Sequence, residues 1–126
     1  MPTDQIALEI AKADVGIYTA LPDPHMSIAM PGKVLEFATI GIPVVASRVP
    51  ILEAFFNDEA ILFFTRGNID EFCDHILKLY HSPSLRQSFI ENANRMFTYK
   101  YSWKNEFDQY LALIHKLAFS QPARRR

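Results

Sequence analysis

The sequence predicts an α/β fold in which helices cover both faces of a parallel sheet, a three-layer α/β/α arrangement. Three short apolar runs, at residues 15–20, 42–47 and 60–64, are typical of buried parallel strands. Helical patterns separate the runs, which favours parallel pairing with right-handed crossovers. Because parallel sheets normally have more than three strands, the pattern resembles the second half of a doubly wound domain.

Length and charge narrow the class of protein further. The 126 residues allow one domain or part of one, and 13 basic against 14 acidic residues leave no basic surface typical of a nucleic-acid partner. One cysteine, Cys73, suits a reducing compartment. Neither a signal peptide nor a run of about 20 apolar residues is present, so we expect a cytoplasmic protein with at most peripheral membrane contact.

The central stretch of the chain is 31–47, PGKVLEFATIGIPVVAS. It follows a loop, 21–32, that contains three prolines and a glycine. The pattern predicts a helix over 33–40 with Val34, Phe37 and Ala38 facing inward. We expect Gly41 to end the helix in the left-handed conformation, before the strand at 42–47.

Further helices are expected on both sides of this stretch. The predicted spans are a helix over about 4–12 that begins at Thr3, and a short helix that starts at Pro50. Asn68 and Glu71 form a capping-box pattern before a third helix. Its predicted apolar stripe is Ile69, Phe72, Cys73, Ile76, Leu77 and Tyr80. On this pattern Cys73 is a core thiol.

Two more helices complete the chain. Ser82 and Pro83 suit the first positions of one helix, whose inward side is predicted to carry Leu85, Phe89, Asn92 and Met96. Ser102 suits the start of the last. The predicted stripe of that helix is Phe107, Tyr110, Leu111, Ile114 and Leu117. We expect the aromatic stripes of both helices to be core, followed by a polar tail at 119–126.

The central stretch also carries a resemblance. The frame Pro-x-Lys-x-x-Glu-aromatic, four residues, then Gly-x-Pro-Val-Val-Ala resembles the C-terminal domain of GT-B glycosyltransferases of family 4. The resemblance extends over about 7–118 and implies a Rossmann-like fold. It implies that 1–126 is a single partial domain, the C-terminal half of the donor-binding domain of a retaining enzyme of the hexosyltransferase type. Such enzymes serve polysaccharide biosynthesis, and their acceptor-binding N-terminal GT-B domain is absent from this chain.

The resemblance also implies a donor site. In the family, the position of Glu36 accepts hydrogen bonds from the ribose hydroxyls of a nucleotide sugar, and Lys33 lies toward the phosphates. Gly32, Ser27 and Ile28 belong to the same implied site. Many members carry a glutamate at the position of Ile28, where it meets the donor sugar. No bound cofactor or metal is implied, the acceptor is unidentified, and we expect the chain to be inactive alone.

Simpler interpretations stand beside these. Lys33 and Glu36, three residues apart, also suit a surface ion pair. His25 and Ser27 suit ordinary solvated loop positions. Arg48 and Glu53 suit either the wall of a cleft or a surface pair. A second functional class is therefore open, a non-catalytic remnant or interaction module that keeps the fold and binds no donor.

Overall fold

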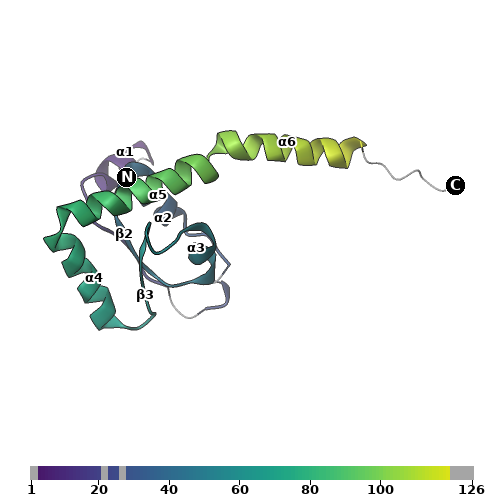
Figure 1. The fold of residues 1–126 in the computed structure, drawn as a ribbon. Helices are drawn as coiled ribbons and strands as arrows, with labels where there is room; N and C mark the ends of the chain where they lie inside the picture. Colours follow the sequence, from purple (N-terminus) through teal and green to yellow (C-terminus); the bar gives the residue numbers. More distant parts are fainter. Residues whose placement is uncertain (1–2, 21–22, 26–27, 120–126) are drawn as a thin grey trace.

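Three short parallel strands form the centre of the fold (Figure 1). The computed structural model describes residues 3–20, 23–25 and 28–119, with the backbone alone at residues 3, 4 and 105. The strands are β1 Gly16–Tyr18, β2 Val44–Ser47 and β3 Leu62–Phe64, in the spatial order β1-β2-β3. Both pairings are parallel. The predicted α/β class is therefore confirmed.

Helices alternate with the strands and then follow them. In the described part of the chain they are α1 Thr3–Ile10, α2 Gly32–Ile40, α3 Pro50–Phe55, α4 Ile69–His81, α5 Pro83–Lys100 and α6 Trp103–Phe119. Each lies where the sequence predicts a helix, with ends shifted by up to two residues. The polar tail predicted from 119 begins later, because Phe119 is the last residue of α6, and 120–126 lie outside the described residues.

The strands are shorter than the apolar runs that predicted them. Ile42 and Pro43 are buried but precede β2. Pro43 has no N–H to donate to a ladder, although its carbonyl accepts a hydrogen bond from the Gly16 N–H at 2.9 Å. Burial therefore extends beyond the hydrogen-bonded ladder.

The two faces of β2 build two apolar cores. All four residues of this central strand are buried. Ala46 belongs to the core that also contains Leu52 of α3. Val45 belongs to the other core, with Leu79 of α4. The sheet is thus covered on both faces, as a three-layer arrangement requires.

The helix of the central stretch matches its prediction. Val34 and Ala38 are buried in α2, and Phe37 packs partly buried against the same core. A Cβ atom on Gly16 would lie 2.5 Å from the Phe37 ring, so this ring needs a glycine on β1. Gly41 has φ 89° and ψ 44°, and its N–H donates to the Phe37 carbonyl at 3.1 Å. The left-handed helix end is therefore confirmed.

The predicted stripe of α4 is confirmed at Phe72 and Ile76 and is wrong at its four other members, which are exposed, namely Ile69, Cys73, Leu77 and Tyr80. Leu79 is fully buried, with Phe72 and Ile76 partly buried beside it. Ile69 is 73% exposed and Tyr80 is 74% exposed. The helix packs against α5, β3 and β2. The inward face is therefore the narrower one that repeats at 72, 76 and 79.

Cys73 lies outside the core, contrary to the prediction. Its thiol is free and the residue is exposed. The exposure of Cys73 has the same cause, the orientation of α4. The side chain of Phe72 faces inward, so the next residue, Cys73, faces away from the core.

The long helix α5 joins the two cores. Ser82 caps it as predicted, its Oγ accepting a hydrogen bond from the Leu85 N–H at 3.2 Å. Phe89 is buried in the core beside α4, and Ala93 is buried in the core beside α2 and α3. Met96 packs partly buried against the latter. The inward stripe predicted for this helix is confirmed.

The last helix is not part of the core, contrary to the prediction. It continues beyond α5 and extends away from the sheet (Figure 1). Large apolar side chains along its length are exposed, namely Trp103, Phe107, Tyr110, Leu111, Leu113, Ile114, Leu117 and Phe119. Helical periodicity identifies such a stripe but does not provide the element that covers it. Within the described residues, the stripe of α6 has solvent as its neighbour.

The start of α4 is capped in a modified way. Asn68 Oδ1 accepts a hydrogen bond from the Glu71 N–H at 3.1 Å, as a capping box requires. The Glu71 carboxylate, however, accepts from the Thr65 N–H at 2.6 Å and not from Asn68. This backbone hydrogen bond lowers the pKa of Glu71 below its ordinary value of 4.5. Glu71 therefore links α4 to the turn after β3.

Replacing Glu71 by glutamine is expected to make unfolding less sensitive to acid. Because the folded-state pKa is lowered, the stabilisation is complete above the unfolded-state pKa and is lost as pH falls through the folded-state value. The urea midpoint should therefore fall less in the variant than in the wild type between about pH 7 and about pH 3. Asp70→Asn removes a charge from the same turn and is the control. Identical pH profiles for Glu71→Gln and the wild type would contradict the link.

No helix in the described part of the chain is long and apolar enough to cross a membrane.

Candidate functional site

The carboxyl ends of the three strands meet at one edge of the sheet. β1 ends at Tyr18, β2 at Ser47 and β3 at Phe64, and the chain then leads toward α2, α3 and α4 respectively. In open parallel sheets, ligands bind at this edge, where the first turns of the helices present free N–H groups. The predicted site residues all lie between the end of β1 and the first half of α2.

The loop from β1 to α2 is attached at both ends. At its start, the Ala20 N–H donates to Ser47 Oγ at 3.1 Å. In its middle, the His25 N–H donates to Asp23 Oδ1 at 2.8 Å. At its end, Met30 packs partly buried against the core. Ser27, one of the predicted site residues, lies outside the described residues.

The first turn of α2 has no side-chain cap. Pro31 occupies the N-cap position with φ −75° and ψ 105°, and it makes no side-chain hydrogen bond to the helix. No acidic residue lies in the first turn, and Gly32 and Lys33 are exposed. A Cβ atom on Gly32 would meet no described atom within 4 Å. The helix start is therefore open, electropositive through its dipole, and next to one lysine.

Glu36 lies on α2, one turn after Lys33. It is exposed and lines a hollow of about 220 Å³ with Ile6, Ala7 and Ile10 of α1. Within the described residues, Glu36 and Lys33 are not joined by an ion pair. The structure therefore does not form the surface ion pair between Lys33 and Glu36. The hollow beside the Glu36 carboxylate leaves room for a ligand.

Ile28 is 75% exposed in the turn that precedes α2. The Ala29 N–H donates to the His25 carbonyl at 3.0 Å and closes that turn. Ile28 thus lies in the loop that leads to α2 and offers only an apolar side chain. Its hydrocarbon cannot accept a hydrogen bond from a sugar hydroxyl.

Arg48 and Glu53 form a surface pair at the same edge. Arg48 Nη1 lies 2.7 Å from Glu53 Oε1, and its Nη2 lies 2.7 Å from Asp58 Oδ1. These two hydrogen bonds, the one to Glu53 first, raise the pKa of Arg48. The guanidinium also lies over the Phe63 ring, 5.0 Å from its centroid. The expected surface pair is therefore confirmed, and it also lines a hollow of about 180 Å³.

A further hollow at this edge was not predicted from the sequence. It has a volume of about 150 Å³ and lies between the end of β1 and the start of α4. Its lining residues are Thr19, Phe64, Gly67, Asn68, Ile69 and Phe72. The capping pattern of Asn68 located the helix start, but the stripe prediction placed Ile69 in the core. The hollow is mostly apolar and depends on the observed rotation of α4.

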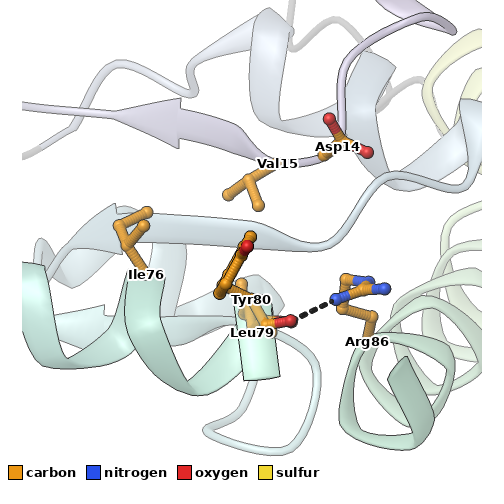
Figure 2. A pocket seen from close by; sticks show the side chains of 6 residues that line it. All are labelled: Asp14, Val15, Ile76, Leu79, Tyr80 and Arg86. Atoms are coloured by element: carbon orange, nitrogen blue, oxygen red, sulfur yellow. Dashed lines mark hydrogen bonds between the residues drawn. The ribbon is translucent and has the colours of Figure 1, made fainter. Parts of the chain in front are cut away.

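A larger hollow lies at the opposite end of the strands. It has a volume of about 350 Å³, and Asp14 and Val15, which precede β1, form one side of it. Figure 2 shows Val15 facing Ile76 and Tyr80 of α4. Arg86 donates to the Leu79 carbonyl, and also to the Tyr80 carbonyl at 3.2 Å, so it caps the end of α4. This hollow is a gap beside β1 and away from the predicted site.

Histidine, cysteine, aspartate and glutamate side chains do not gather in any group of three that could hold a metal ion, within the described part of the chain. Two buried polar atoms, Tyr18 Oη and His75 Nδ1, have no partner among the described residues. Tyr18 is the last residue of β1, and its side chain packs partly buried against the core that contains Val34 and Leu52.

The fold and site together define a class, an α/β domain with a parallel sheet and an open helix start at the carboxyl edge. Comparison with known proteins gives the family. Residues 1–112 match the family model described as "Glycosyl transferase-like". The chain belongs to this glycosyl transferase-like family.

The chain is also similar to a protein whose name includes a glycosyltransferase domain. "Glycosyltransferase 1 domain-containing protein 1" of Xenopus tropicalis is 31% identical over 100 residues. The match covers 78% of this chain and 28% of the relative. The chain thus spans well under two thirds of that protein's length.

Proposed function

We propose that this chain supplies part of the donor site of a glycosyltransferase, where α2 binds the nucleoside diphosphate of a nucleotide sugar. One observation carries the proposal. The uncapped first turn of α2, with Gly32 and Lys33 exposed, lies one helical turn before the carboxylate of Glu36, which forms no ion pair within the described part of the chain. This order suits a ligand with phosphates followed by vicinal hydroxyl groups.

Each group has a definite role in this proposal. Phosphate oxygens accept hydrogen bonds from the free N–H groups of the first turn and are attracted by Lys33. The Glu36 carboxylate accepts hydrogen bonds from both ribose hydroxyls at once. Ile28 contacts the donor sugar only through apolar atoms, and Ser27 is proposed as a phosphate contact.

The reaction is proposed to be transfer of a hexose with retention, in a GT-B enzyme that serves polysaccharide biosynthesis. The acceptor, unidentified, binds to a separate N-terminal domain, so this chain is inactive alone. No cofactor or metal ion is proposed, because α2 and Lys33 provide the positive charge that a diphosphate needs. The single cysteine supports a cytoplasmic location.

A second candidate function is an interaction module, and α6 favours it. This helix exposes a stripe of large apolar side chains, and such surfaces commonly mark interaction sites. In this case the fold is kept while the site at α2 binds no donor.

Titration calorimetry with UDP and GDP separates the two candidates. The donor proposal predicts that one of them binds with a dissociation constant in the micromolar range. Uridine and guanosine, which lack the diphosphate, are the matched controls and should bind far more weakly. If neither diphosphate binds, or if nucleosides bind equally well, the donor proposal fails and the interaction module is favoured.

A further inference from the structure

The last residue of β2 places a hydroxyl group inside an apolar sheet. Ser47 is 2% exposed, and it is the buried polar residue among those that the structure describes. Burying a hydroxyl is unfavourable unless it is hydrogen-bonded. Its Oγ accepts from the Ala20 N–H, 27 residues earlier in the chain. The contact joins the end of β2 to the loop that follows β1.

The strand register explains why a side chain makes this contact. The Gly16 N–H donates to the Pro43 carbonyl, one residue before its partner Val44. If the ladder continued with this register, the Ala20 N–H would donate to the Ser47 carbonyl. The ladder ends at Tyr18, and the Ser47 hydroxyl takes the place of that carbonyl. The chain can therefore leave the sheet without an unpaired N–H group.

Ala20 itself is buried, with 8% of its surface exposed. A buried N–H group without an acceptor is costly, so the hydroxyl determines where the loop root lies. From this root the loop runs to Met30, which packs against the core immediately before α2. Ala20 at the start of the loop and Met30 at its end are thus both attached to the sheet and its core.

We propose that Ser47 is a positioning residue for the donor site. Its hydroxyl holds Ala20, where the chain leaves the sheet, and Ala20 lies at the same carboxyl edge of the sheet as the first turn of α2, where the diphosphate is proposed to bind. Ser47 makes no contact with the ligand. The inference rests on the proposed function for its effect on binding, whereas the anchoring of Ala20 is measured separately.

The test compares Ser47→Ala, Ser47→Thr and the wild-type chain by amide hydrogen exchange and nucleotide titration. Ser47→Ala is expected to speed exchange at Ala20 about tenfold or more, while exchange at Val45 stays near the wild-type rate. The dissociation constant for UDP or GDP should rise several-fold. Ser47→Thr keeps the hydroxyl and should restore both values. Ser84→Ala, the same change at an exposed position of α5, is the control.

Each other result overturns the proposal in a distinct way. Unchanged exchange at Ala20 means that the hydroxyl does not hold the loop root. Equal acceleration at Ala20 and Val45 means that Ser47 stabilises the whole fold and positions nothing in particular. A wild-type chain that binds nucleotide, with unchanged affinity in Ser47→Ala, refutes the positioning role and leaves the proposed function intact. A wild-type chain that binds neither nucleotide refutes the proposed function and, with it, this role.

Discussion

Replacing Glu36 by alanine is expected to weaken binding of UDP or GDP by at least about tenfold. Hydrogen bonds to a charged group contribute about 1.5–3 kcal/mol each, and about 1.4 kcal/mol corresponds to a factor of ten. Glu36 is exposed and unpaired among the described residues, so its removal leaves no buried partner unsatisfied. The loss should therefore appear in affinity and not in stability.

The ribose role can be isolated with a ligand that lacks the hydroxyl groups. The wild-type chain should bind UDP or GDP more tightly than the corresponding 2′,3′-dideoxy nucleotide, and Glu36→Ala should bind both alike. Glu91→Ala removes an exposed carboxylate from α5 and is the control for net charge. If Glu36→Ala still discriminates between the two ligands, the carboxylate does not bind the ribose.

Replacing Leu79 by alanine is expected to lower the free energy of unfolding by about 2–5 kcal/mol. Leu79 of α4 is fully buried in the core on one face of the sheet, so the change removes apolar contacts and leaves a cavity. Leu77→Ala, two residues earlier, should change it by no more than about 0.5 kcal/mol. That side chain is 52% exposed on the same helix. Urea denaturation measures both values.

This pair of variants also tests the orientation of α4. The stripe predicted from the sequence contains Leu77 and omits Leu79, whereas the structure buries Leu79. A larger loss for Leu77→Ala than for Leu79→Ala would contradict the structure and favour the predicted stripe.

Local signals predicted the parts of the fold that depend on neighbouring residues. Gly41 marked the end of α2 because few other residues adopt its positive φ. Ser82 marked the start of α5 because its hydroxyl accepts a hydrogen bond three residues ahead. In each case the reason for the structure lies within one turn of the residue itself.

Features that depend on distant elements were not predictable in this way. Leu77 and Leu79 are the same type of residue on the same helix, and only the position of the sheet decides which one is buried. The stripe of α6 has the periodicity of a core helix, but no described element covers it. The contact between Ala20 and Ser47 joins the loop after β1 to the end of the neighbouring strand β2, and predicting it requires the strand register.

The candidate site was also predicted only in part. The frame around Lys33 and Glu36 located the site on one helix, and the structure adds that α2 begins without a cap at the carboxyl edge of the sheet. The sequence left open whether Lys33 and Glu36 pair with each other, and among the residues that the structure describes no ion pair joins them. The sequence also offered Arg48 and Glu53 as a surface pair, but it did not show that Asp58 holds Arg48 as well.

The most direct test of the account is to map the binding of UDP or GDP on the chain by amide chemical shifts. The account predicts changes centred on Gly32 and Lys33, extending to Ala20 at the loop root, with the amides of α6 unaffected. Changes confined to α6, or to the hollow beside Val15 and Tyr80, would contradict the proposal that α2 forms the donor site.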